Sequence, residues 1–170
     1  MPDPPRDPAP SRPPGRLLVL GLGNRIASDD AVGLLIVDRL AASVSCPRTT
    51  ILPSERGGLE FIDLLTGYND VIVVDSIRTG RNAPGEIIRF RPEEFSGSPR
   101  GTAVHDVSLF QALELGRMLG LPMPARVEII AVEIIENRRV AEKISPPVQQ
   151  AMISAAAQVA AVAREMGYAW

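Results

Sequence analysis

The hydrophobic residues of this chain follow two patterns that alternate along its length. Continuous apolar runs bounded by glycine or polar residues are typical of buried strands. Such runs predict strands at residues 16–23, 49–54, 70–77 and 126–134, and a turn followed by an edge strand at residues 83–95. Between these runs, apolar residues recur at the spacing of amphipathic helices. This spacing predicts helices at residues 29–44, 58–67, 106–119 and 145–167, with a polar loop over residues 93–104.

Strands that alternate with helices predict an α/β fold. We expect a three-layer sandwich, in which a twisted, mostly parallel sheet of about five strands carries helices on both faces. Ligands of such sheets bind at the carboxyl ends of the strands. This rule points to residues 21–30, after the first predicted strand, and to Asp75, near the end of the 70–77 strand.

Composition indicates how the chain is divided into domains and in which compartment we expect the protein. Residues 1–15 are rich in proline, so we expect a disordered tail there and a single α/β domain over residues 16–170. The net charge of −2, without a basic block, argues against a nucleic-acid partner. The sequence has neither an apolar run of membrane-spanning length nor the apolar core of a signal peptide. Together with Cys46 as the only cysteine, these features favour a cytoplasmic protein without a disulfide, which we expect to be a monomer.

The stretch GLGNRIASDDAVG, residues 21–33, combines a glycine turn with an acidic pair. Gly21 and Gly23 match the start of the dinucleotide-binding pattern G-x-G-x-x-G, but Ile26 replaces its third glycine. Asp29 and Asp30 would also repel a phosphate at the start of the following helix. The turn therefore offers only weak support for a nucleotide-binding site.

The acidic residues have structural as well as chemical interpretations. Ser28 or Asp29 can cap the helix that begins here, which leaves Asp30 without an evident structural task. Asp75 can cap the turn at the end of its strand. However, that strand is otherwise apolar, and a buried carboxylate must be paired or bound to a metal.

His105 is the only histidine, and it precedes a predicted helix. It can be an ordinary surface residue, but a helix N-terminus disfavours the imidazolium and keeps the ring available as a ligand. With Asp30 and Asp75 it would form a divalent-metal site for nickel, zinc or manganese. A Ser–His–Asp triad has weaker support, because the G-x-S-x-G elbow is missing.

Three stretches together resemble the hydrogenase maturation proteases, which trim the large subunits of nickel–iron hydrogenases. They are LVLGLGNRIASDDAVGLLIVDRL, VIVVDSI and AVHDVSLFQAL, and the similarity runs from about Arg16 to the final helix. The resemblance places the metal-contacting residues of the family at Asp30, Asp75 and His105. It implies an endopeptidase, an aspartic-type hydrolase, that removes the C-terminal extension of a large-subunit precursor after nickel insertion.

The resemblance also implies the metal and the partner. The nickel would come with the precursor, and zinc or another divalent ion could substitute for it; no resident cofactor-binding residue is expected. Asp30, Asp75 and His105 would then recognise the nickel or act in catalysis. Two alternatives remain at this point: a nucleotide-binding oxidoreductase built on Gly21 and Gly23, and a non-catalytic metal-binding scaffold for hydrogenase maturation.

Overall fold

The computed structural model describes residues 15–95, 104–135 and 143–170, with the backbone alone for residues 95 and 104–108. Most of the expected tail therefore lies outside the described residues, as does most of the expected 93–104 loop. The strands are β1 (Leu17–Leu22), β2 (Thr49–Ser54), β3 (Asp70–Ile77), β4 (Ile87–Phe90) and β5 (Arg126–Glu133). The helices are a 3-10 turn η1 (Ser28–Ala31), α1 (Val32–Ser43), α2 (Glu60–Leu65), α3 (Pro92–Phe95), α4 (Val104–Met118) and α5 (Pro146–Glu165).

The five strands form one sheet in the order β2-β1-β3-β5-β4. All neighbours are parallel except β4, which pairs antiparallel with β5 at the edge. The carboxyl ends of β1, β3 and β5 therefore meet at one end of the sheet. The predicted α/β class, the mostly parallel sheet and the edge position of the strand after residue 83 are confirmed.

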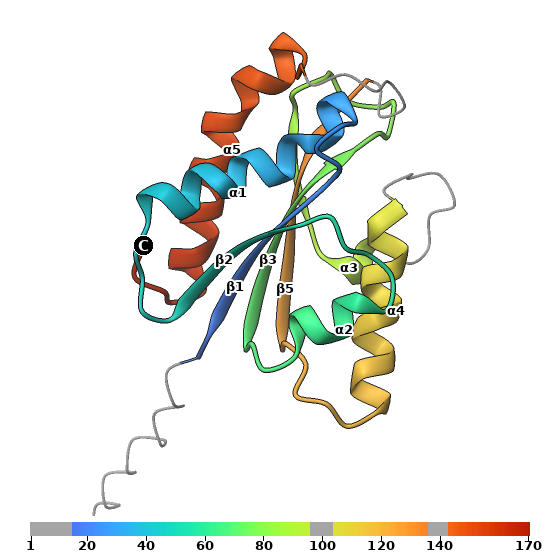
Figure 1. Cartoon of the computed structure of the whole chain (residues 1–170), viewed down its shortest axis with the longest axis vertical. Coiled ribbons are helices and arrows are strands. Elements are labelled where there is room, and N and C mark those ends of the chain that lie inside the picture. The colour runs from blue at the N-terminus through green and yellow to red at the C-terminus, as the bar shows by residue number, and fades with distance from the viewer. Residues whose placement is uncertain (1–14, 96–103, 136–142) are drawn as a thin grey trace, which may run out of the picture.

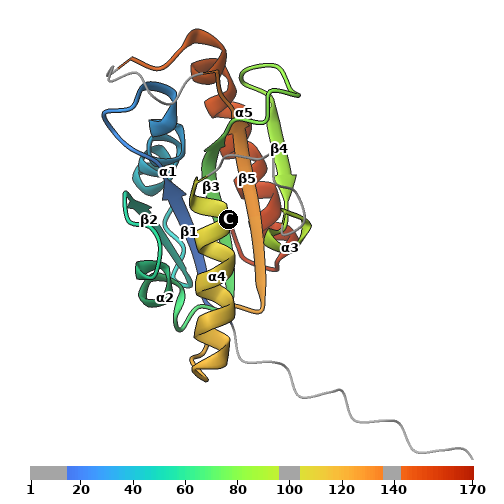
Figure 2. The ribbon, with the colours of Figure 1, turned by 90° about the vertical axis from the view of Figure 1, so that its right-hand side faces the viewer.

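Helices cover both faces of the sheet, as expected for a three-layer sandwich (Figure 1). Helices α1 and α5 lie on one face, where their apolar side chains pack against Val19, Ile72 and Ile130. Helices α2 and α4 lie on the other face and pack against Leu18, Val73 and Ile129 (Figure 2). Successive strand residues alternate between the two cores, because side chains of a strand point to opposite faces.

The glycine turn after β1 brings the chain close to its neighbours instead of forming a phosphate cradle. Gly23 has a φ of +144° and lies against the backbone carbonyl of Asp30, where a Cβ atom has no room. Gly21 lies against the backbone of Gly33 and the side chain of Val37 in α1. These glycines let the chain turn sharply into η1 while α1 packs directly on the sheet.

Several expected boundaries are wrong. The helix expected from residue 29 begins as the 3-10 turn η1, so α1 starts at Val32, and α2 is shorter than the expected 58–67. Residues 92–95 form the short helix α3, where the sequence favoured the end of an edge strand and a loop. Pro92 explains this, because proline ends a ladder but suits the first turn of a helix. Helix α4 begins at Val104, two residues earlier than expected. Its core-facing side chains are Leu109, Ala112 and Leu113, whereas Phe110 is only half-buried.

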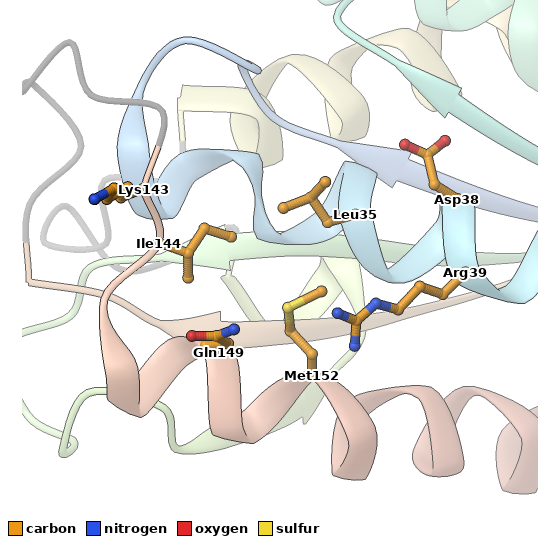
Figure 3. A pocket seen from close by; sticks show the side chains of 7 residues that line it. All are labelled: Leu35, Asp38, Arg39, Lys143, Ile144, Gln149 and Met152. Atoms are coloured by element: carbon orange, nitrogen blue, oxygen red, sulfur yellow. The ribbon is translucent and has the colours of Figure 1, made fainter.

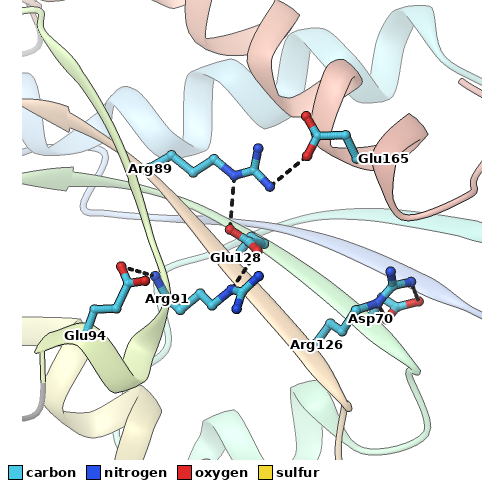
Figure 4. A network of polar contacts seen from close by, with 7 residues as sticks. All are labelled: Asp70, Arg89, Arg91, Glu94, Arg126, Glu128 and Glu165. Atoms are coloured by element: carbon cyan, nitrogen blue, oxygen red, sulfur yellow. Dashed lines mark hydrogen bonds and ion pairs between the residues drawn. The ribbon is translucent and has the colours of Figure 1, made fainter.

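Edge strand β4 is tied to the sheet by a network of charged groups (Figure 4). Glu128 of β5 accepts hydrogen bonds from Arg89 and Arg91, each at 3.0 Å. Arg89 also pairs with Glu165 near the end of α5 at 2.8 Å. The network adds side-chain links to the backbone pairing of β4 with β5, and it joins both strands to α5.

In the described ranges, no helix has the length and apolar character needed to cross a membrane.

Candidate active site at the carboxyl edge of the sheet

Asp30 lies in η1, held by a tightly bonded loop. The Asn24 side chain accepts a hydrogen bond from the Ile26 amide at 3.1 Å, an Asx turn that braces this loop. The Asp30 amide donates to the Ala27 carbonyl at 3.0 Å. Ser28 adopts a φ of +47°, a left-handed conformation that is uncommon outside glycine. This loop delivers Asp30, which is half-buried, to the end of the sheet.

Ser76 links the two candidate carboxylates. Its hydroxyl donates to Asp30 Oδ1 at 2.6 Å, and its backbone amide donates to Asp75 Oδ1 at 2.7 Å. Asp75 is 1 % exposed, near the end of central strand β3. The structure therefore brings Asp30 and Asp75 to the same edge, as the rule for parallel sheets predicted.

The two carboxylates approach this edge from opposite faces of the sheet. Asp75 belongs to the set of β3 residues that faces α2 and α4, together with Val73 and Ile77. Ser76 faces the other way, toward η1 and α1, where it meets Asp30. His105 is in the first turn of α4, whose chain runs back along the face that Asp75 belongs to (Figure 1). The His105 side chain lies outside the described part of the structure.

Asp30 and Asp75 each present a carboxylate at this edge, and Ser76 donates a hydrogen bond to each of them; carboxylate oxygens are ligands for divalent cations. Among the described side chains, no group of three or more potential ligands is close enough to hold a metal by itself. The carboxylates would thus need a further donor, from this chain or from a bound partner. Hard oxygen donors joined by an imidazole suit nickel, zinc or manganese.

Asp29 does not cap a helix, which corrects the expectation from sequence. Neither η1 nor α1 has a side-chain cap. The Asp29 carboxylate instead accepts two hydrogen bonds from Ser145, one from the amide at 2.6 Å and one from the hydroxyl at 2.9 Å. Ser145 occupies the N-cap position of α5, but its side chain does not cap that helix either.

Glu133 is a functional candidate that sequence reasoning missed. It is 1 % exposed at the end of β5, and it accepts hydrogen bonds from the amides of Thr79 and Gly80 and from the Thr79 hydroxyl. It thereby fixes the segment that follows β3, at the positions four and five residues beyond Asp75. A signal was available, since Glu133, like Asp75, is an acid at the end of an apolar strand.

Neither Asp30 nor Asp75 lines the two pockets that follow. One, of about 410 Å³, lies between α1 and the start of α5, lined by Leu35, Asp38, Arg39, Lys143, Ile144, Gln149 and Met152 (Figure 3). Another, of about 460 Å³, follows the ends of β3 and β5, where Arg78 and Ile135 line it. The second is at the same edge of the sheet as Asp75.

Comparison with known proteins identifies the family. A model of the hydrogenase maturation proteases matches residues 34–162. The hydrogenase 2 maturation protease of Escherichia coli K12 is 30 % identical over 154 residues, covering 89 % of this chain and 93 % of that protein.

Solved structures agree. The E. coli hydrogenase maturating endopeptidase HybD has a TM-score of 0.77 at 29 % identity, covering 89 % of this chain and 94 % of that one. A NiFe hydrogenase maturation protease from Thermococcus kodakarensis shares the fold, with a TM-score of 0.68 at 20 % identity over 87 % of this chain and 99 % of that one. The chain therefore belongs to the hydrogenase maturation protease family and is a peptidase.

Proposed function

We propose that this peptidase removes the C-terminal extension of a nickel–iron hydrogenase large-subunit precursor after nickel insertion. Asp30, Asp75 and His105 bind the nickel that the precursor carries. The observation that carries the proposal is the pair of carboxylates, Asp30 and Asp75, bridged by Ser76 at the carboxyl edge of the sheet.

The proposed ligands explain how the peptidase can recognise a precursor that already contains nickel. Two carboxylates and one imidazole leave coordination positions open, and the precursor fills them with its own ligands. Nickel held in both proteins aligns the C-terminal segment of the precursor with the peptidase. Zinc or another divalent ion can occupy the same donors.

The residues of this chain then have separate tasks. Asp30 and Asp75 supply negative charge to the cation, and Ser76 orients both through one hydroxyl and one amide bond. His105 supplies the third donor from the start of α4. A chain that needs a metal-loaded partner to complete its site would act little on unrelated peptides. We place the reaction in the cytoplasm, with the enzyme acting as a monomer.

The decisive experiment compares nickel-loaded with nickel-free precursor and measures the loss of C-terminal mass. We expect cleavage of the loaded form only. Asp30→Asn, Asp75→Asn and His105→Ala should each lower the rate by about 100-fold or more, because each removes one donor to the cation. Asp38→Asn is the control, because Asp38 lies on α1 and pairs with Arg25 at the surface.

Two results would contradict the proposal. Full processing of the precursor by Asp75→Asn and His105→Ala would show that these residues do not form a metal site needed for cleavage. Equal cleavage of the nickel-loaded and nickel-free precursors would show that nickel is not the signal. A precursor whose mass never changes would instead favour a non-catalytic scaffold.

A further inference from the structure

Asp29 is a buried carboxylate whose bonds lead away from the helix that it precedes. It is 3 % exposed, and both of its oxygens accept hydrogen bonds from Ser145. These two residues are 116 positions apart in the sequence. An isolated buried charge is costly, so a carboxylate here is retained only because Ser145 satisfies it.

A third hydrogen bond runs between the same two segments. The Ser28 hydroxyl donates to the Lys143 carbonyl at 3.0 Å. Ser28 and Asp29 are the two residues immediately before Asp30, and residues 143–145 lead directly into α5. The three hydrogen bonds therefore attach η1 to the start of α5.

Helix α5 is a firm support for this attachment. It runs from Pro146 to Glu165 and buries Val148, Ala151 and Met152 against the core. Ser145 therefore has a fixed place at the N-terminal end of a long packed helix. A turn bonded to Ser145 takes its own position from α5.

We propose that Asp29 is a positioning residue that holds Asp30 in place by fastening η1 to Ser145. Asp29 does not itself contact the substrate or the metal. This inference rests on the proposed function, in which Asp30 binds the nickel of the precursor. With the fastening intact, the Asp30 carboxylate accepts a hydrogen bond from the Ser76 hydroxyl at 2.6 Å. Without it, the Ser28–Lys143 bond is the one described hydrogen bond that still attaches η1 to the start of α5.

The chemistry of the two bonds separates positioning from charge. In Asp29→Asn the amide oxygen still accepts from the Ser145 N–H, and the amide nitrogen donates to the Ser145 hydroxyl, which can also accept. In Asp29→Ala both bonds are lost. A positioning role survives the first change and fails in the second, whereas a metal ligand or a base fails in both.

The test measures kcat/KM on nickel-loaded precursor for both variants. Asp29→Ala should lower it by about 10- to 100-fold, as expected when a reacting group is misplaced. Asp29→Asn should stay within about threefold of the natural protein, because its bonds are kept. Asp70→Ala is the matched control: it removes another buried, bonded carboxylate, but at the opposite end of β3.

Hydrogen exchange gives a reading that does not depend on activity. In Asp29→Ala the Asp30 amide should exchange about tenfold faster or more, because η1 opens more readily. In Asp70→Ala, measured under the same conditions, the ratio of the Asp30 amide exchange rate to the exchange rates of the core-strand amides should be the same as in the natural protein. If Asp29→Ala does not fold, Ser145→Ala replaces it, since this variant loses the hydroxyl bond alone and should show smaller changes in the same directions.

The outcomes separate this inference from the proposed function. The positioning role of Asp29 would be overturned if Asp29→Ala processed precursor and exchanged its Asp30 amide at the same rates as the natural protein. It would also be overturned if Asp29→Asn were as inactive as Asp29→Ala. Normal processing by Asp30→Asn would instead overturn the metal site. In that case exchange at the Asp30 amide would still show whether Asp29 fastens the turn.

Discussion

Gly33 sets the distance between α1 and the sheet. It lies in the first turn of α1, and a Cβ atom at this position would collide with the backbone carbonyls of Leu22 in β1 and Val74 in β3. Backbone atoms of central strands cannot move aside as a side-chain tip can. The residue that follows the acidic pair by three positions therefore determines how η1 and Asp30 sit on the edge of the sheet.

We expect Gly33→Ala to lower the free energy of unfolding by about 3 kcal/mol, because α1 must move off the strands. It should also slow precursor processing, since Asp30 moves with α1. Urea denaturation and the processing assay measure the two effects.

Gly58→Ala is the control for this prediction. Gly58 has a φ of +63° but open space around it, so only backbone strain of about 1–2 kcal/mol is expected. Its processing rate should not change. Equal stability of Gly33→Ala and the natural protein would contradict the close packing of α1.

Glu128 determines how β4, the shortest strand, stays on the sheet. Burial of the Glu128 carboxylate raises its pKa, but hydrogen bonds from Arg89 and Arg91 lower it by more, so the pKa lies below its ordinary value of 4.5. The two guanidinium groups stabilise the charged form. Strand β4 is followed directly by α3, so the attachment of β4 to the sheet also fixes where α3 begins.

A carboxyl whose pKa is lowered by folding stabilises the folded protein above its unfolded pKa. That stabilisation is lost as pH falls through the folded pKa. We therefore expect the natural protein to exceed Glu128→Gln in unfolding free energy by about 1–3 kcal/mol at pH 7. The difference should be full above about pH 5 and should narrow as the pH falls below 4.5.

Urea denaturation of both proteins across this pH range measures the difference. Glu165→Gln is the control, since Glu165 pairs with Arg89 but its side chain is 56 % exposed, and its loss should cost less than about 1 kcal/mol. A difference that stayed constant down to pH 3 would show that the charge of Glu128 is not the cause.

At the scale of the whole molecule, the two ends of the sheet carry different groups of polar residues. At the amino end, Asp70 accepts two hydrogen bonds from Arg126, at 2.6 and 2.9 Å, and one from the Tyr168 hydroxyl at 2.6 Å. These bonds fasten the end of the chain to β3 and β5. At the carboxyl end are Asp30 and Asp75, the metal ligands of the proposed function, so the bonds of Asp70 lie a strand's length away from the proposed site.

Tyr168→Phe should therefore affect stability alone. Burial and the bond to Asp70 raise the pKa of Tyr168, so its phenol keeps the proton that it donates. We expect a loss of about 1–2 kcal/mol in unfolding free energy, because a buried acceptor loses a donor. Processing of nickel-loaded precursor at 25 °C should not change. A slower reaction with unchanged substrate affinity would contradict the separation of the two ends.

Much of the architecture could be predicted from the sequence, because its signals are local. Continuous apolar runs and period-3.6 patterns, together with glycine and proline, indicated the order of strands and helices, and the rule for parallel sheets selected the edge that holds Asp30 and Asp75. The helix at Pro92 was missed although proline is a local signal for it, and the early start of α4 was missed because helix ends are poorly defined by the local pattern. The role of His105 stays a prediction.

The sequence by itself determined the alternation of elements, the apolar strand that ends at Asp75 and the motifs that indicate a hydrogenase maturation protease. These follow from residue types and their spacing. Only the tertiary structure decided what each polar side chain bonds. Asp29 meets Ser145 across 116 positions, and Ser76 meets Asp30 across 46. Such partners depend on strand register and on the packing of α1 and α5, and no local pattern encodes these. The acidic pair thus became two residues with different partners: Asp30 joins Asp75 through Ser76, and Asp29 bonds the start of α5.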